Sequence, residues 1–134
     1  MIEAFDDIIG SALARRTPQR LVFLFVKAVH AQPGDPYHIA GARLLPVLSM
    51  DKVLAPELRF ASLISEADDI DRRWDFVLIA CLGRRDGGLP SSDEARAHLR
   101  ERARLALELG DLSPFVVLDR GERPLWLKAQ RALH

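Results

Sequence analysis

Cysteine is scarce in this sequence: the 134-residue chain has one, Cys81, together with only four histidines. A single cysteine cannot form an internal disulfide, and these few side chains cannot build a thiolate zinc cluster. The composition is typical of a reducing compartment, so we expect a cytoplasmic protein. We predict no metal site and no cofactor.

The sequence also lacks a net charge, because nineteen basic residues balance nineteen acidic ones. Without an overall positive field, we do not expect nucleic acid as a partner. No apolar run approaches the ~20 residues of a membrane span, and we expect neither a membrane segment nor a secretion signal. The expected partner is a protein or a second copy of this chain.

The most uniformly apolar stretch, Trp74–Leu82, predicts a central strand. An unbroken apolar run cannot alternate between core and water, so both faces of this strand need cover by helices. Residues 21–26 have the same character and predict a second buried strand. Residues 44–50 predict a third, at an edge or with a bulge, because Pro46 lacks a ladder donor. The expected core residues on the two apolar strands are Phe23, Phe25, Phe76, Leu78 and Ile79.

Apolar residues at helical spacing predict three helices. The first covers about residues 2–15, and the second begins at Pro56, which suits the first position of a helix. The third runs from the capping box Ser91-x-x-Glu94 to Gly110, a residue that readily adopts the left-handed conformation of a helix end. These three helices supply the cover that the buried strands need.

Residues 115–118 and 125–127 flank a glycine-containing loop and predict a terminal hairpin. The expected fold is therefore α/β, a single domain over residues 1–134 with a mixed five-stranded sheet flanked by three helices. The order of the strands stays open. The connection over residues 31–43 is either a crossover or a wide hairpin, because its length is near the minimum for a crossover.

The catalytic candidates are His30, His38 and Cys81. If residues 31–43 form a crossover, the strands ending at His30 and Cys81 run parallel, and a thiol and an imidazole can meet at one sheet edge. If they form a hairpin, the two side chains lie at opposite edges. His38 shares the long connection with Asp35 and Tyr37, where proton-transfer groups could converge, although a surface loop is the favoured interpretation.

A loop of glycines and arginines leads into the third helix and resembles in outline an anion site at a helix N-terminus. Its candidate ligand-binding residues are Gly83, Arg84, Arg85, Gly87 and Gly88. However, Asp93 and Glu94 put carboxylates where an anion would sit, and no phosphate-binding glycine motif is present. A capped helix after a flexible turn is the favoured interpretation.

An acidic run ends the second helix and comprises Glu66, Asp68, Asp69 and Asp71. Oxygen-rich clusters can hold calcium or magnesium, but the spacing does not match a calcium-binding loop of the EF-hand type. A solvated helix end is the favoured interpretation, although negative charge at this end opposes the helix dipole.

Arg96, Arg100 and Arg104 recur every four residues and share one ridge of the third helix. Residues 57–71 carry five acidic side chains against one arginine. Such complementary surfaces suit pairing with a second copy of the chain in a homodimer. The equally weighted alternative is a solvated face, in which Glu101 and Glu108 neutralise Arg104 from one turn away.

Short packing and turn segments occur along most of the chain: Phe5-Asp6-Asp7, Pro18–Phe23, Pro46-Val47 before Met50-Asp51-Lys52, Trp74-Asp75, and Phe115–Arg120 with Gly121. These segments resemble landmarks of a family of small bacterial proteins whose members often carry the label ribonucleotide reductase alpha subunit. The resemblance implies a shared fold and no activity. A reductase cycle needs several cysteines for radical and dithiol chemistry, and one cysteine cannot run it.

Every catalytic arrangement considered above is incomplete, so the sequence favours a small non-catalytic binding or protein-interaction module. The alternative is a small enzyme or anionic-ligand-binding protein that uses the sheet edge near Cys81, Gly83 and Arg84.

Overall fold

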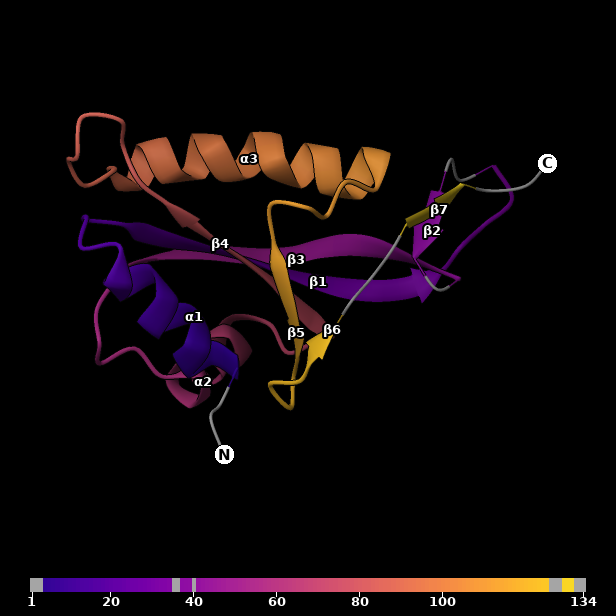
Figure 1. Ribbon diagram of the computed structural model, residues 1–134. Helices are drawn as coiled ribbons and strands as arrows, with labels where there is room; N and C mark the ends of the chain where they lie inside the picture. The colour runs from indigo at the N-terminus through magenta and orange to yellow at the C-terminus, as the bar shows by residue number, and fades with distance from the viewer. Residues whose placement is uncertain (1–3, 35–36, 40, 126–128, 132–134) are drawn as a thin grey trace.

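The computed structural model describes residues 4–34, 37–39, 41–125 and 129–131. One sheet lies between two helical layers, with α3 on one face and α1 and α2 on the other (Figure 1). The elements are α1 (Ala4–Ala14), β1 (Arg20–His30), β2 (Tyr37–Ile39), β3 (Ala42–Val53), α2 (Phe60–Ile70), β4 (Phe76–Leu82), α3 (Ser92–Leu109), β5 (Val116–Asp119), β6 (Pro124–Leu125) and β7 (Ala129–Arg131).

The strands have the order β6-β5-β4-β1-β3-β2-β7, and every pairing between neighbours is antiparallel. The predicted α/β class with three helices is confirmed, and the five predicted strands are present together with the short strands β2 and β7. The prediction of a mixed sheet is wrong.

The strand in the middle of the sheet is β1, and β4 lies next to it. The stretch that was predicted as the central strand therefore forms an interior strand beside the central one.

The connection after β1 is a wide hairpin, because β1 and β3 run antiparallel and His30 pairs with Ala42. Only residues 31–41 separate these paired residues, and a crossover to a parallel strand needs a dozen or more. The structure thereby decides between the two alternatives that the sequence leaves open.

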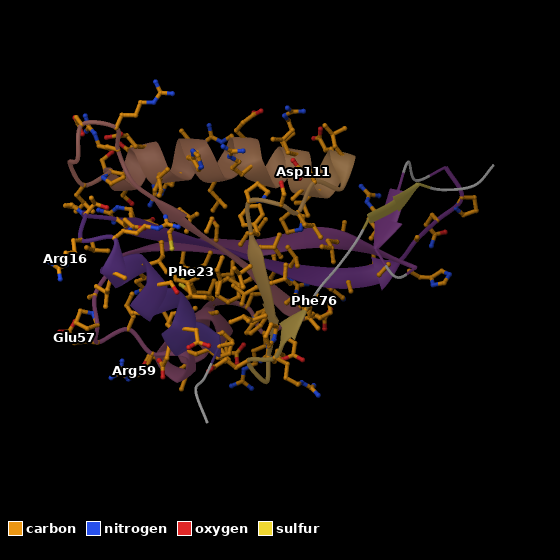
Figure 2. All side chains as sticks on the ribbon, viewed as in Figure 1. Arg16, Phe23, Glu57, Arg59, Phe76 and Asp111 are labelled. Atoms are coloured by element: carbon orange, nitrogen blue, oxygen red, sulfur yellow. The ribbon has the colours of Figure 1, made fainter. Side chains whose placement is uncertain are left out.

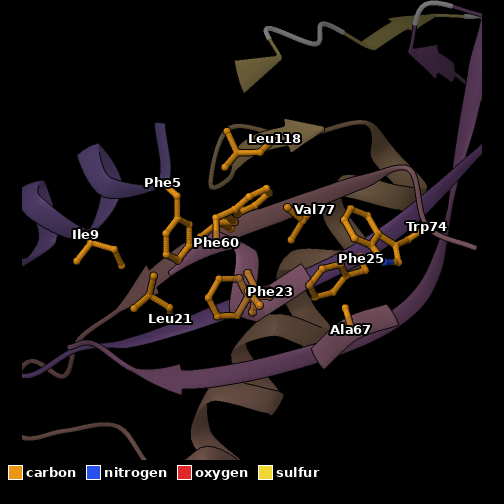
Figure 3. Close-up of a cluster of buried hydrophobic side chains, with 12 residues drawn as sticks. Phe5, Ile9, Leu21, Phe23, Phe25, Phe60, Ala67, Trp74, Val77 and Leu118 are labelled. Carbon is orange, nitrogen blue, oxygen red and sulfur yellow. The ribbon is translucent and has the colours of Figure 1, made fainter. Parts of the chain in front are cut away.

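The strand β1 is buried on both faces, and its alternating side chains divide between two cores. Leu21, Phe23 and Phe25 pack against α1 and α2, together with Phe5 and Phe60 (Figure 3). The intervening side chains of β1 face α3 and form a second cluster with Val117 and Leu99; they are Val22, Leu24 and Val26. A period of two with helices on both sides explains why the strand has no polar face.

Four of the five predicted core residues are buried, namely Phe23, Phe25, Leu78 and Ile79. Phe76 is only partly buried because it is the first residue of β4, at the margin of the α3-side cluster. Phe23 lies within the dense layer of side chains beside the sheet, whereas Glu57 and Arg59 lie at the periphery (Figure 2).

The N-terminus of α3 carries the predicted capping box. The Ser91 hydroxyl accepts a hydrogen bond from the Glu94 amide, and the Glu94 carboxylate accepts one from the Ser91 amide. The helix ends at Gly110, whose φ of 72° is left-handed as predicted. The prediction that Pro56 opens the second helix is wrong, because Pro56 lies in a turn and α2 begins at Phe60.

We expect Ser91→Ala to lower the free energy of unfolding by about 1 kcal/mol, because the Glu94 amide loses its acceptor. Urea denaturation followed by circular dichroism measures the change. Ser91→Thr retains the hydroxyl and is the matched control. An alanine variant as stable as the parent would show that the capping box does not stabilise α3.

Candidate functional site

The antiparallel sheet separates the catalytic candidates His30 and Cys81. Cys81 pairs with Leu21, and His30 lies nine residues further along β1. At about 3.3 Å per residue this separation is about 30 Å, far beyond hydrogen-bond reach, so the hairpin alternative, in which His30 and Cys81 lie apart, is the one that the structure has. The backbone of His38 lies in β2 opposite Gln130. Asp35, its predicted neighbour in this loop, lies outside the described residues.

Cys81 lines a hollow of about 400 Å³ between α1 and the end of β4, opposite Ser11 and Arg15. Burial raises the pKa of the Cys81 thiol, and the nearby charge of Arg15 only partly opposes this shift. A thiol with a raised pKa is protonated at neutral pH and is a poor nucleophile. This environment does not support the alternative of an enzyme with a nucleophilic cysteine.

We expect iodoacetamide to alkylate Cys81 at pH 8 at least about tenfold more slowly than it alkylates a blocked cysteine peptide, because partial burial and a raised pKa both reduce the accessible thiolate. Mass spectrometry over time measures the rate. Unfolding the protein in urea should restore the peptide rate. Equal rates for the folded protein and the peptide would contradict the assigned environment.

In the loop considered as an anion site, the charged side chains and amides bind one another and the start of α3. Arg84 forms ion pairs with Asp86 at 2.8 Å and with Glu94 at 3.2 Å. The Gly88 amide donates to the Asp86 carboxylate at 2.9 Å, and Gly87 takes a left-handed φ of 81°. These contacts agree with the interpretation of a turn before a capped helix. The remaining candidates, Gly83 and Arg85, are exposed.

Three of the four carboxylates of the acidic run in and after α2 are engaged by cations. Lys52 binds Glu66 at 2.7 Å, and Arg120 binds Asp68 at 2.8 Å. Hydrogen bonds from Arg73 lower the pKa of Asp71 to about 2. Within the described ranges, no group of three or more histidine, cysteine or acidic side chains could hold a metal ion. The ion pairs offset the unfavourable position of these charges at the end of the helix.

Asp68 also completes a contact network around Trp74 that the sequence analysis missed. The Trp74 ring is 1% exposed, and its indole N–H donates to Asp68 at 3.0 Å. The Arg120 guanidinium lies 4.0 Å from the Trp74 ring centroid and donates to the Trp74 carbonyl oxygen at 3.1 Å. Asp68 and Arg120 therefore fix a buried aromatic residue, which is a structural role.

The outer edge of β3 has unpaired backbone groups. In an antiparallel ladder, alternate residues of a strand direct their N–H and C=O groups to the same neighbouring strand. The Leu54 amide donates to the Gln19 carbonyl, so every second residue of β3, counted back from Leu54, directs its backbone groups toward β1. The intervening residues Ser49, Asp51 and Val53 turn theirs outward. Among the described residues, β2 pairs with β3 only at Ala42, and no other strand pairs with this edge.

A groove runs between this edge of β3 and α3, and we call it the edge groove. Two adjoining hollows of about 230 and 290 Å³ form it and share Ser49, Arg96 and Leu99. Val22 and Leu24 of β1 contribute its apolar floor. The edge groove thus combines an apolar floor, free backbone groups and basic side chains.

The N-terminus of α3 is fastened to β3 at one end of the edge groove. The Ser92 hydroxyl donates to Asp51 at 2.9 Å, and Arg20 forms an ion pair with the same carboxylate at 2.9 Å. The side chains of Asp51 and Arg20 are each only 15% exposed, so this carboxylate is compensated within the protein. These contacts hold the N-terminus of α3 against β3.

The three arginines on one ridge of α3, Arg96, Arg100 and Arg104, differ in their contacts. Glu101 and Glu108 bind Arg104 at 3.0 and 3.7 Å and raise its pKa, as the solvated-face alternative predicts. Arg96 and Arg100 are exposed, form no ion pair with any described residue, and line the edge groove. The ridge therefore presents its two free charges beside the unpaired edge of β3.

A bulge and a proline limit the length of the free edge. Phe25 pairs with Leu48 and Val26 with Pro46, so Val47 is an additional residue on β3. Proline has no amide hydrogen, and a bulge twists the strand away from regular pairing. A partner strand can therefore pair regularly with residues 48–53.

In the part of the chain that the structure describes, no helix is long and apolar enough to cross a membrane. No family model, curated protein or solved structure matches this chain.

Proposed function

We propose that this protein is a non-catalytic protein-interaction module that binds a partner segment in the edge groove. The observation that carries the proposal is the row of outward-facing backbone groups at Ser49, Asp51 and Val53, directly beside the edge groove, which is polar near Asp51 and apolar near Leu24. Unpaired strand edges are templates for another strand, and peptide-binding domains use this mode with a helix beside the edge.

The chemistry elsewhere in the described chain supports binding over catalysis. Cys81 has a raised thiol pKa, and His30 is remote from it. Arg84 is engaged by two carboxylates. A binding module requires none of these groups to react.

The test begins with selection of a displayed library of random twelve-residue peptides against the protein. An enriched peptide is then titrated into nitrogen-15-labelled protein. We expect the largest amide shift changes at Ser49, Asp51 and Val53, because a strand added to this edge bonds to those amides. Failure to enrich any peptide, or shift changes confined to another surface, would reject the proposed function.

Ser49→Pro is a sharp second test, because it removes an outward amide hydrogen and leaves the bonds between β1 and β3 in place. We expect at least tenfold weaker peptide binding with little change in melting temperature. Ser49→Ala keeps the amide and is the matched control, which should bind like the parent. Equal binding by the proline variant would show that strand addition at β3 is not the binding mode.

The hollow beside Cys81 supports a second candidate, a site for a small anionic ligand. The cation that lines it is Arg15, and the carboxylate of Asp7 lines it as well. Ligand-observed NMR with a panel of small aliphatic and aromatic carboxylates tests this candidate. Saturable binding that Arg15→Gln abolishes would support it, and binding that is unaffected by this substitution would reject it.

A further inference from the structure

We infer that the partner of the edge groove is an extended acidic segment of another protein, with two acidic residues separated by one uncharged residue. It adds to β3 as a strand and places its two carboxylates on Arg96 and Arg100. This inference rests on the proposed function and specifies the chemistry of the partner.

The register of an added strand decides which of its side chains face α3. Residues that are directly opposite each other in an antiparallel ladder project to the same face of the sheet. Ser49 and Asp51 pair with Leu24 and Val22, whose side chains pack toward α3. Partner residues opposite Ser49 and Asp51, and their alternate neighbours, therefore also project toward α3.

The spacing of the two free arginines matches the spacing of alternate residues in a strand. Arg96 and Arg100 are four residues apart on one helical ridge, which places their Cβ atoms about 6 Å apart. Alternate residues in a strand are about 6.6 Å apart and project to the same face. Because Asp51 contacts Ser92 while Ser49 lies beside Arg96 and Arg100, the ridge runs alongside the edge of β3. Two carboxylates with one residue between them can therefore reach both guanidinium groups.

The residue between the two acids faces the other side of the sheet. There Lys52 is already bound to Glu66 at 2.7 Å, and Glu66 also lines the edge groove. A third acidic side chain would lie near the Glu66 carboxylate, and the lysine beside it is already paired. We therefore expect an uncharged residue between the two acids.

A second copy of this chain is a poorer occupant on electrostatic grounds. If two β3 edges joined antiparallel about a two-fold axis, both α3 helices would lie on the same face of the joined sheet. Arg96 and Arg100 of one copy would then face the same arginines of the other. Of the five acidic residues in 57–71 that were predicted to receive the ridge in a homodimer, Glu66, Asp68 and Asp71 are bound to cations of their own chain, which leaves Glu57 and Asp69 to receive it.

The test uses fluorescein-labelled nine-residue peptides of threonine and valine in fluorescence anisotropy titrations. One peptide carries Glu-Val-Glu at its centre, a second carries Gln-Val-Gln, and a third carries the two glutamates side by side. We expect the first peptide to bind about tenfold more tightly than the second in low salt, the third to resemble the second, and the difference to shrink in 0.5 M NaCl because exposed ion pairs are screened.

Substitutions on the protein identify the cations. Arg96→Gln combined with Arg100→Gln should remove the preference for Glu-Val-Glu over Gln-Val-Gln. Arg72→Gln is the matched control, because Arg72 is exposed, follows α2 and lies outside the edge groove. A preference that survives the double substitution, or is lost equally in the control, would overturn the assignment to Arg96 and Arg100.

The possible failures are distinguishable. Peptides that bind equally with Glu or Gln, and that Ser49→Pro still weakens, would overturn the acidic partner and leave the proposed function intact. Failure of all peptides combined with a dimer that Ser49→Pro dissociates in sedimentation velocity would identify a second copy as the occupant and overturn the inference. No peptide binding and a monomer at all concentrations would reject the proposed function itself.

Discussion

Phe23→Ala should lower the free energy of unfolding by about 3–5 kcal/mol, because it removes an aromatic ring from a packed core. Phe23 is 0% exposed, and its ring centroid lies 6.4 Å from that of Phe5. Domains of this size are stable by about 5–15 kcal/mol, so the loss would be a large part of the total. Urea denaturation followed by far-ultraviolet circular dichroism measures it.

Phe76→Ala is the matched control for this prediction, because it deletes the same side chain from a partly buried position on a neighbouring strand. We expect less than half of the loss found for Phe23→Ala. Equal losses at the two positions, or a Phe23→Ala variant that melts within a degree or two of the parent, would contradict the assigned core.

Asp68→Ala should lower the free energy of unfolding by about 1–3 kcal/mol, because the buried indole N–H of Trp74 loses its acceptor. The same substitution leaves Arg120 without the carboxylate that it binds at 2.8 Å. Chemical denaturation monitored by tryptophan fluorescence measures the stability.

Two controls separate this network from ordinary surface charge. Asp68→Asn keeps an oxygen acceptor for the indole and should recover part of the loss. Asp69→Ala removes an exposed neighbouring carboxylate and should change the stability by less than about 0.5 kcal/mol. A double-mutant cycle with Arg120→Ala should show a coupling of at least about 0.5 kcal/mol, and simple additivity would mean that Asp68 and Arg120 do not act together.

Features specified by neighbouring residues could be predicted from the sequence. The apolar runs of β1 and β4, the capping box at Ser91 and the helix end at Gly110 depend on periodicity and on contacts within one turn. The edge or bulged character of residues 44–50 followed from the missing amide hydrogen of Pro46. Each of these signals lies within a few residues of the structure that it predicts.

Features that depend on the pairing of distant segments could not be predicted. The antiparallel sheet order decides that His30 and Cys81 lie at opposite ends, and no local pattern encodes that order. The contact of Arg120 with Trp74 joins residues 46 positions apart in the chain. Such contacts follow from the packing of the whole chain.

The candidate site likewise has one part that could be predicted from the sequence and one part that could not. The helical spacing of Arg96 and Arg100 identified a charged ridge from the sequence alone. The unpaired backbone groups of Ser49 could not be predicted from the sequence. They depend on the strand order, because a strand has a free edge only where no other strand pairs with it. Pro46 was the one local signal that pointed to β3 as an edge strand.

Pro46 has a consequence for the solubility of the chain as well as for its fold. It interrupts Leu44-Leu45-Pro46-Val47-Leu48, a stretch without charge whose other residues are all apolar. Uncharged apolar segments of this length on a sheet edge form intermolecular cross-β aggregates, and proline is among the residues that prevent such stacking. We therefore expect the residue that shortens the free edge of β3 also to protect newly made or partly unfolded chains from aggregation. The free edge that remains is confined to the part of β3 that Arg96 and Arg100 keep positively charged.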